Sequence, residues 1–469
     1  MAIAAAAAMI VTTTRHVLPA GLNSTVNVGR FSCRKKHQRK RRKKRRQNDD
    51  DDDEMMMVTE SELMHRDPHL GEDVNFYGFA FTWSNLHESK AELERQRQVG
   101  DDAADEAVRE LHEMGIRPRL HAVEEAAAAK PDGACARLVH ECSIEPPWLD
   151  RSRLRRGQRF FLRHMVITAP ALFHLSLVGG FGAPLICRVL SATGYLSGCG
   201  GGAYRRLLET AVMVIDCMAE DALVPGSGDG WKGVLAVRLL HAEVRVRLMA
   251  KASWKREKFG VPINQEDLRA TQLAFSMLVL YAVERVGMRA SWEDMEDYMH
   301  LWRYIGVLMG VKSDERPPAM RLDNIDSAKA QLESILLHLV RPDDAVAKMV
   351  NNVLFSIVDR PPRRLSANRV ISLTRFYTSN AYADVLGVPD LPPFWSAWYH
   401  IAMYALTCHV VVTIMSLPAL GPWLETVSQK GSKKIREKLA SKENKGCPVD
   451  FGLSKLVEER LPYPHLQAL

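Results

Sequence analysis

One histidine flanked by two arginines is the group in this sequence whose residue types and spacing best suit chemistry. His241 lies within Trp231–Met249, where apolar residues recur three and four apart, as on one face of a helix. Arg238 precedes it by three positions and Arg245 follows by four, so both lie along the edge of its apolar stripe. A neutral imidazole among apolar side chains can ligate a metal or haem iron, and the guanidinium groups can pair with a cofactor's anionic groups. The alternative is a hydrogen-bonded core histidine with two surface arginines.

A second set of polar residues lies on the helix that the pattern predicts at Tyr204–Asp221. Arg206, Glu209 and Thr210 share one face there, at spacings of three and four, and this face continues as apolar. Polar groups that converge on an apolar face suit a pocket that handles oxygen; the alternative is the polar surface of an ordinary amphipathic helix. The glycine-rich segment before it, 197–203, lacks the Gly-Lys-Ser/Thr ending of a phosphate-binding loop, so we do not expect it to bind a nucleotide.

The stretches that must position these residues have helical periodicity. We find no repeat and no alternating strand pattern of any length, so the body is predicted to be all-α. Asn264 and Ser291 are predicted N-caps of two helices, and the second of these helices carries Arg303 near its middle. The aromatic residues of Gly71–Trp83 indicate a capping strand or loop. Further helices are predicted at Asn324–Val340, Asp343–Val358 and Ile371–Leu386.

The composition and charge favour a globular body with a separate basic tail. The chain has 469 residues, 46% of them hydrophobic, and its net charge of +7 comes from one run, Arg34–Arg46. Residues 1–60 are predicted to form a disordered tail, and Met1–Asn48, which has no acidic residue, resembles an organelle transit peptide. A nuclear localisation patch and a solvated tail without such a role are the alternatives. Nucleic-acid binding is not favoured, because the run lacks the aromatic residues that base stacking requires. The eight cysteines include no CxxC pair, which indicates reduced thiols.

Two uncharged stretches are long enough to cross a bilayer. Met165–Ile186 is interrupted by Pro170 and several glycines, which favours a broken, buried helix that lines a pocket. Phe394–Trp423 has tryptophans near its ends and lysines after it, which is typical of a membrane-inserted helix; a re-entrant or interfacial helix and a buried hairpin remain alternatives. The predicted division is a tail at 1–60, a helical body at 61–385, and a C-terminal hydrophobic helix with its own tail at 386–469.

Six segments, in this order, resemble one known family. They are PPWLDRSRLRRGQRFF (146–161), SLVGGFGAPLICRVLSATGYL (176–196), RRLLET (205–210), VRLLHAEVR (237–245), GVPINQEDLRATQLAFS (260–276) and EDYMHLWRYIGVLMG (296–310). Together they resemble the haem-dependent oxygenase family of the bacterial rubber oxygenases, or latex clearing proteins, and of the ER-bound oxygenase of mycophenolic acid biosynthesis. The resemblance covers roughly residues 71–311 and is weaker beyond.

The resemblance implies a helical domain whose globin-like core holds haem b. It also implies oxidative cleavage of a C=C bond of an isoprenoid chain with dioxygen, giving two carbonyl ends. The family's proximal iron ligand corresponds to His241. The distal R-x-x-K-T pattern of the rubber oxygenases corresponds to Arg206, Glu209 and Thr210, so a glutamate stands where the family has its lysine.

The residues and the resemblance together predict a haem b oxygenase that acts on a hydrophobic isoprenoid or prenylated substrate at a membrane. Arg238, Arg245 and Arg303 are candidates to pair with the haem propionates, since a guanidinium matches a carboxylate bidentately. Glu209, with Arg206 and Thr210, could accept a proton or relay one to bound dioxygen. The alternatives are a haem-binding protein without oxygenase activity and a membrane-associated helical interaction protein. The compartment is predicted only as an organelle or a membrane.

Overall fold

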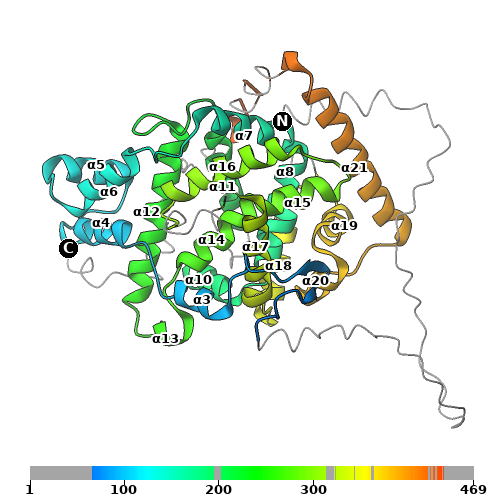
Figure 1. Cartoon of the computed structure of the whole chain (residues 1–469), viewed down its shortest axis with the longest axis horizontal. Helices are drawn as coiled ribbons and strands as arrows, with labels where there is room; N and C mark the ends of the chain where they lie inside the picture. The colour runs from blue at the N-terminus through cyan, green and yellow to red at the C-terminus, as the bar shows by residue number, and fades with distance from the viewer. Residues whose placement is uncertain are drawn as a thin grey trace, which may run out of the picture.

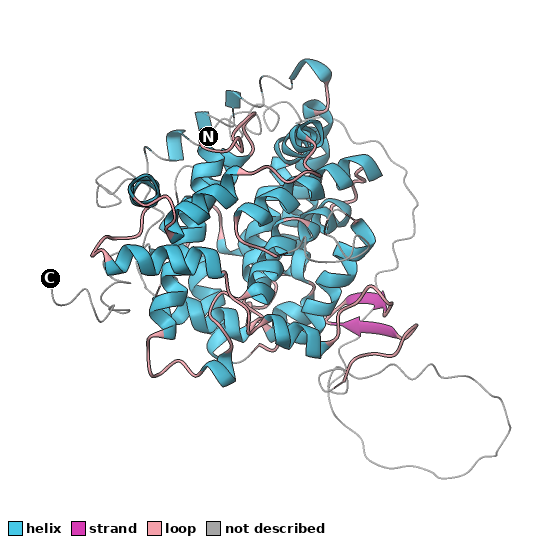
Figure 2. Ribbon diagram, turned by 60° about the vertical axis from the view of Figure 1, so that its left-hand side comes forward, coloured by secondary structure: helices cyan, strands magenta, loops and turns pink. Residues whose placement is uncertain are grey.

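The computed structural model describes residues 66–194, 202–312, 322, 324–342, 344–360 and 364–420, with scattered positions between 423 and 437. The described chain is all-α, as the sequence predicts, apart from one hairpin at the edge of the body (Figure 2). Its strands, β1 (Asp73–Phe76) and β2 (Phe79–Thr82), pair antiparallel, with Val74 opposite Phe81. The predicted tail at 1–60 and most of the glycine-rich segment lie outside the described residues.

The helices pack together into a body (Figure 1) with one large hydrophobic cluster and two smaller ones. In chain order they are α3 (Lys90–Gln96), α4 (Asp102–Glu113), α5 (Leu120–Ala129), α6 (Ala134–Ser143), α7 (Arg151–Arg163), α8 (Met165–Ala171), the π-helix η1 (Leu172–Leu177), α9 (Val178–Gly180), α10 (Pro184–Thr193), α11 (Gly202–Cys217), α12 (Asp229–Met249), α13 (Arg256–Phe259), α14 (Gln265–Phe275), α15 (Met277–Arg285), α16 (Trp292–Leu308), α17 (Ile325–Leu339), α18 (Asp344–Phe355), α19 (Ala367–Thr378), α20 (Asn380–Val385), α21 (Phe394–Met415) and the 3-10 helix η3 (Pro418–Leu420).

Helix α12, which carries His241, is buried over most of its circumference. It lies against α4, α11 and α16. Trp231 at its start is wholly buried, and its Nε1 donates a hydrogen bond to the Cys142 carbonyl oxygen at 3.0 Å. The helix begins at Asp229, two residues before the predicted start, because the turn before it closes through Trp231 N and the Ala222 carbonyl oxygen at 2.8 Å. The central element of the sequence prediction is therefore also central in the fold.

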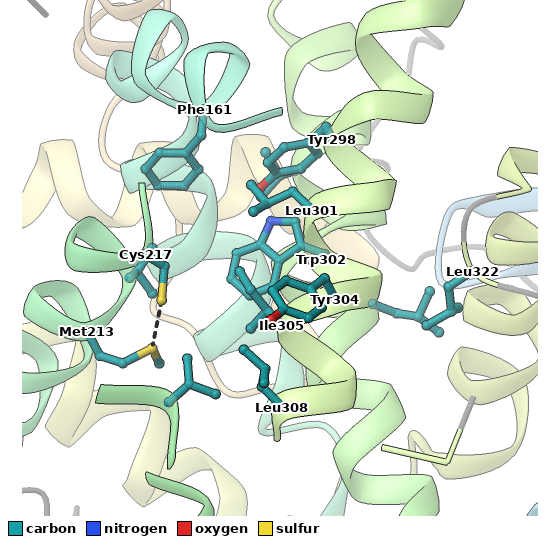
Figure 3. Packing of buried hydrophobic residues seen from close by; sticks show 14 of the residues in the cluster. Phe161, Met213, Cys217, Tyr298, Leu301, Trp302, Tyr304, Ile305, Leu308 and Leu322 are labelled. Atoms are coloured by element: carbon teal, nitrogen blue, oxygen red, sulfur yellow. Dashed lines mark hydrogen bonds between the residues drawn. The ribbon is translucent and has the colours of Figure 1, made fainter. Parts of the chain in front are cut away.

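The core beside α12 is formed by side chains from α7, α11 and α16. Figure 3 shows Trp302 of α16 lying between Tyr298 and Tyr304, with Met213 and Cys217 of α11 across from it. The Cys217 thiol contacts the Met213 sulfur at 4.0 Å. Met213 and Cys217 are four residues apart, and so are Tyr298 and Trp302, which is a spacing that brings one helical face into contact with another.

Helices α7 and α16 cross at close range because a glycine lies at the crossing. A Cβ at Gly157 would lie 2.4 Å from the backbone oxygen of Asp297. The basic face of α7 is tied to α16 by charge as well, since Arg153 donates to Asp297 at 3.0 Å and Arg156 pairs with the same carboxylate. The arginines that make α7 basic therefore serve helix packing.

The uncharged stretch Met165–Ile186 is broken into short buried pieces, as predicted. The chain turns by 83° between α7 and the Met165–Gly180 segment. Pro170, which has no N–H to donate, lies just before the π-helix η1, where the regular ladder is also interrupted. Within η1, the buried His174 pairs through Nδ1 with the Thr374 hydroxyl at 2.8 Å, which fixes this segment to α19.

The helix predicted at Ile371–Leu386 is wrong as a single element. The structure divides it into α19 and α20 at Ser379, whose φ of +73° does not continue a right-handed helix. The Ser379 hydroxyl accepts a hydrogen bond from Tyr382 N, so it caps the second helix, and donates to the Tyr77 carbonyl oxygen at 2.8 Å. The break is therefore stabilised by a contact with the distant hairpin.

Helix α21 is the only described helix that is long and apolar enough to cross a membrane on its own. It lies on the outside of the body in Figure 1, against α8 and α19. It ends at Met415 because Pro418 cannot continue it, so it is shorter than the predicted stretch 394–423.

Candidate functional site

His241 has a ring nitrogen that is buried and makes no hydrogen bond. Its imidazole lies deep in the molecule but keeps some accessible surface, and its Nδ1 is buried without a hydrogen-bond partner. The neighbouring residues on its face are apolar: Val244 and Leu248 are buried against Val189 of α10, and Leu240 packs beside them. Since buried polar atoms are almost always paired, an orphaned imidazole nitrogen on an apolar face requires an explanation.

The electrostatic surroundings keep this imidazole neutral. The pKa of His241 is lowered to about 4, chiefly by burial. The nearby Arg245 guanidinium also lowers this pKa, and its effect is larger than the opposite effect of the Asp101 carboxylate. A ring nitrogen that carries no proton has a lone pair to donate, which is the form that ligates iron. At neutral pH, His241 is therefore uncharged and has a lone pair that could bind a metal ion without the prior loss of a proton.

Arg238 and Arg245 both point to helix α4, away from the apolar face. Arg238 donates from Nε and Nη2 to the two oxygens of Asp101 at 2.8 and 2.9 Å, and from Nη2 to Glu141 at 2.8 Å. Arg245 donates from Nε to Asp105 at 2.7 Å and from Nη1 to the Ile263 carbonyl oxygen at 2.8 Å. The interpretation of both as surface arginines is wrong, because each is at least 97% buried.

The carboxylates of this network respond differently to burial. Burial raises the pKa of Asp105 to about 6, because the desolvation of its charge outweighs the stabilisation by Arg245. Burial acts in the same direction on Asp101, but the hydrogen bonds from Arg238 hold the pKa of Asp101 below its usual value. Asp101 is thus the permanent anion of the network. Both carboxylates were absent from the sequence prediction; only their spacing of four residues, which places them on one face of α4, hinted at a shared role.

The role of Arg238 and Arg245 as propionate partners stays a prediction. Their main donors already serve carboxylates of the chain itself. Arg245 nevertheless keeps one buried nitrogen, Nη2, without a hydrogen bond; an Asp101 carboxylate oxygen lies 4.0 Å from it. Of the two, Arg245 is therefore the better equipped to take a further anionic partner.

Arg303 lies apart from this network, on the face of an aromatic ring. Its guanidinium carbon is 3.6 Å from the centre of the Trp148 ring. The same ring meets His300 edge-on, and His300 accepts a hydrogen bond at Nε2 from Asp150 N at 3.0 Å. His300 therefore joins α16 to the start of α7.

Of the three polar residues predicted to converge on α11, Arg206 and Glu209 lie together, whereas Thr210 does not join them. Glu209 is buried, and its carboxylate accepts a hydrogen bond from Arg205 Nε at 2.9 Å and pairs with Arg206 through its other oxygen. Thr210, the next residue around the helix, is exposed, and in the described part of the chain it makes no side-chain hydrogen bond to Arg206 or Glu209. Arg205, which the sequence prediction missed, completes the pairing because it lies one turn before Glu209.

Comparison with known proteins gives a consistent result. Residues 163–413 match the model of the family described as ER-bound oxygenase mpaB/B'/Rubber oxygenase, catalytic domain. A rubber oxygenase of Streptomyces sp. (strain K30) is 26% identical over 307 residues, which are 63% of this chain and 72% of that protein. Among solved structures, the latex clearing protein LCP in its closed state matches with a TM-score of 0.56 and 21% identity, over 72% of this chain and 91% of that one; this likeness is one of fold.

Proposed function

The chain belongs to the family of the ER-bound and rubber oxygenase catalytic domains, and from this premise we propose that it is a haem b oxygenase that cleaves a C=C bond of a hydrophobic isoprenoid or prenylated substrate with dioxygen. Membership of this family supports an oxygenase activity in general. The haem, the substrate and the residues that serve them are our proposal.

The observation that carries the proposal is the state of His241. A b-type haem needs one strong axial donor beside an apolar slot. His241 offers a neutral imidazole with an orphaned nitrogen, next to the partly accessible side chains of Val237 and Leu240. In the described part of the chain, no three His, Cys, Asp or Glu side chains converge as metal ligands. A porphyrin needs only one such ligand from the protein, so these residues fit a haem.

The chain's own residues divide the remaining work. A bound haem would supply the redox chemistry with dioxygen. His241 would hold it from one side, and Arg245 Nη2 is the donor best able to meet a propionate. Glu209 is the candidate for holding or accepting a proton. Each of its two oxygens receives one hydrogen bond, from Arg205 or Arg206, and keeps a second lone pair with which it could accept a proton from a substrate.

An absorption spectrum with metal analysis tests this proposal. We expect the full chain, produced with ample haem precursor, to contain iron and to show a Soret band. His241→Ala should abolish the band while the helical circular dichroism remains, and added imidazole should restore part of it. His164→Gln is the matched control, since His164 is also buried but is paired through Nδ1 with the Phe160 carbonyl oxygen at 2.9 Å. Iron-free wild-type protein, or a Soret band that survives His241→Ala, would overturn the proposal.

A haem-binding protein without oxygenase activity is the second candidate. The observation that favours it is Glu209, which stands where the rubber oxygenase pattern has a lysine and is held between two arginines. The two functions differ in one measurement. An oxygenase yields carbonyl products from prenylated compounds or polyisoprene only when dioxygen is present, whereas a carrier keeps the Soret band and yields none.

Membrane association is part of the same proposal, since a lipophilic substrate partitions into lipid. Helix α21 supports it by its length and apolar composition. The N-terminal segment that resembles a transit peptide lies outside the described residues, and organelle targeting remains a proposal that a fusion of residues 1–60 to a fluorescent protein would test.

A further inference from the structure

Helix α21 presents an apolar line to the outside along its whole length. Its first residues include large aromatic side chains that are mostly exposed: Phe394 by 70%, Trp395 by 77% and Tyr399 by 57%. The exposed line continues through Leu406 and Thr413, and Leu417, which follows the end of α21, is also exposed. Tyr399, Leu406 and Thr413 are seven residues apart, a spacing that keeps them on one face of a helix. Exposed apolar surface of this extent marks a site of association.

The opposite face of α21 packs on the body, and its printed hydrogen bonds to other helices lie around the middle of the helix. Ala397, Tyr404 and Val411 are buried and also follow one another at seven-residue spacing, about half a turn from the exposed line. Tyr404 bonds to the hydroxyl of Tyr377 on α19 and donates to the Val166 carbonyl oxygen on α8 at 3.3 Å.

About one and a half turns after Tyr404, the exposed His409, on the flank of α21 beside Leu406 and Thr413, donates from Nε2 to the Val286 carbonyl oxygen at 2.9 Å, directly after α15. A helix that crossed a bilayer would break these contacts or draw the charged helices beside it into hydrocarbon, where each unpaired polar group is costly.

The charge pattern around α21 selects the partner. Residues 391–424 contain no Asp, Glu, Lys or Arg, whereas residues 425–445 contain seven Lys and Arg against three Glu. Lys430, Lys433 and Lys434 are exposed. Beside the His409 contact, Arg285 and Arg289 are also exposed, with Glu284 as the acidic residue among them. Tryptophan and tyrosine favour the boundary between headgroups and acyl chains, and lysine clusters next to an inserted segment bind anionic lipids.

We propose that α21 lies in the plane of a membrane whose surface carries anionic lipids, with the Trp395–Tyr399–Leu406–Thr413 line inserted at the headgroup boundary and Lys430, Lys433 and Lys434 on the headgroups. This inference deepens the membrane association of the proposed function and is independent of the haem. It turns the α21 face of the body, formed with α8, α15 and α19, toward the lipid (Figure 1). A lipophilic substrate dissolved in the bilayer would then reach the protein from this side.

Vesicle flotation with the full chain tests the docking. The probes are vesicles of phosphatidylcholine alone and vesicles in which about 30% of the lipid is the anionic phosphatidylserine. We expect binding to the anionic vesicles that weakens as salt is raised. Trp398, one turn after Trp395, is also exposed, by 60%. Trp395→Ser with Trp398→Ser should lower the partition coefficient at least tenfold. Trp292→Ser is the matched control, because Trp292 is 54% exposed at the start of α16 and should leave binding unchanged.

Further variants separate the apolar and charged parts. The triple change Lys430→Glu, Lys433→Glu and Lys434→Glu should remove the preference for anionic vesicles. Equal binding by the double tryptophan variant and the wild type would overturn the proposal. So would a concentration-dependent dimer that buries α21 and binds no vesicle.

The depth of single labels distinguishes an in-plane helix from a spanning one. Tyr399→Cys, Leu406→Cys and Thr413→Cys would each carry a spin label, and depth in the bilayer would be measured by paramagnetic relaxation. The background replaces the cysteines outside the described residues: Cys33→Ser, Cys199→Ser and Cys447→Ser. Similar depths at all three positions support the proposal, whereas a spanning helix would give a difference of roughly 21 Å between the first and last label.

The absorption spectrum of the same preparation separates the two proposals. If the protein binds vesicles but has no Soret band, the result supports the membrane docking and contradicts the haem function. If the protein has a Soret band but binds no vesicle, the result supports haem binding and contradicts the membrane docking.

Discussion

Arg238 and Asp101 form a bidentate ion pair inside the protein, and this pair fixes helix α4 against the helix that carries His241. Both side chains are at most 5% exposed, and the two hydrogen bonds are 2.8 and 2.9 Å long. The backbone at Gly310 makes room for the pair, since a Cβ there would lie 2.4 Å from Asp101 and 2.8 Å from Arg238. Because the partners are 137 residues apart, the pair joins regions that local structure cannot connect.

We expect Asp101→Asn to cost about 3 kcal/mol in the free energy of unfolding, because it leaves a buried guanidinium without its main anion. Equilibrium urea unfolding measures this. The control is Asp221→Asn, which removes the exposed partner of Arg155 and should leave the free energy essentially unchanged. The role assigned to the Arg238–Asp101 pair is refuted if the two substitutions have equal effects.

The crossing of α7 and α16 makes a second prediction with its own control. Gly157→Ala places a methyl group 2.4 Å from the backbone oxygen of Asp297, and neither helix backbone can yield easily. We expect a loss of about 1–3 kcal/mol in the free energy of unfolding. Gly180→Ala meets no atom within 4 Å, so the same change there should be neutral or stabilising by up to about 1 kcal/mol. Thermal unfolding of both variants checks the difference, and similar melting temperatures would contradict it.

The features that the sequence predicts correctly are those that depend on neighbouring residues. The caps at Asn264 and Ser291 are confirmed, because each side chain accepts a hydrogen bond from the N–H three residues later. The helix around His241 and the break in Met165–Ile186 are confirmed for the same reason, since apolar spacing and Pro170 act locally.

The features that the sequence does not predict depend on distant partners. The break at Ser379 is stabilised by Tyr77, more than 300 residues away, and the burial of Arg238 depends on Asp101. Arg206 and Glu209 pair because they lie within one turn, but the spacing alone could not tell that Thr210 lies on the exposed side. The apolar environment of His241 was predictable from its helix, whereas its orphaned nitrogen required the packed structure.

Asp267 gives a prediction about pH. Burial raises the pKa of this carboxyl to about 7, and one of its oxygens has no hydrogen-bond partner. In the unfolded chain its pKa is near the ordinary value of about 4. Between these two pH values the native state holds a proton that the unfolded state has released, so this group's contribution to stability falls as pH rises from about 4 to about 7.

Asp267→Asn should remove that fall. The difference in the free energy of unfolding between the variant and the wild type should shift in favour of the variant as pH rises from 5 to 7. We expect this shift to be at most about 1.4 kcal/mol per pH unit. Urea unfolding at several pH values measures the difference. Asn264 donates to the other oxygen of Asp267 at 3.1 Å, and an asparagine at 267 can still accept this bond. A difference between variant and wild type that is constant with pH would show that Asp267 does not hold the proton.

Glu209 is the residue whose substitution best separates a proton-transfer role from a structural one. In Glu209→Gln the side chain keeps its shape and one acceptor oxygen, which can still receive the hydrogen bond from Arg205. If Glu209 takes a proton from the substrate, as we propose, product formation should fall about a hundredfold or more while the Soret band is unchanged. Product formation is measured by oxygen uptake and carbonyl analysis with the substrate that wild type turns over. Glu220→Gln, a change at an exposed residue shortly after the end of α11, is the control. Glu209→Lys restores the family's residue type but faces a lysine toward Arg205 and Arg206, and we expect it to lower stability and to yield no product. If Glu209→Gln retains full turnover while Glu209→Lys unfolds, the carboxylate serves only to hold the two arginines.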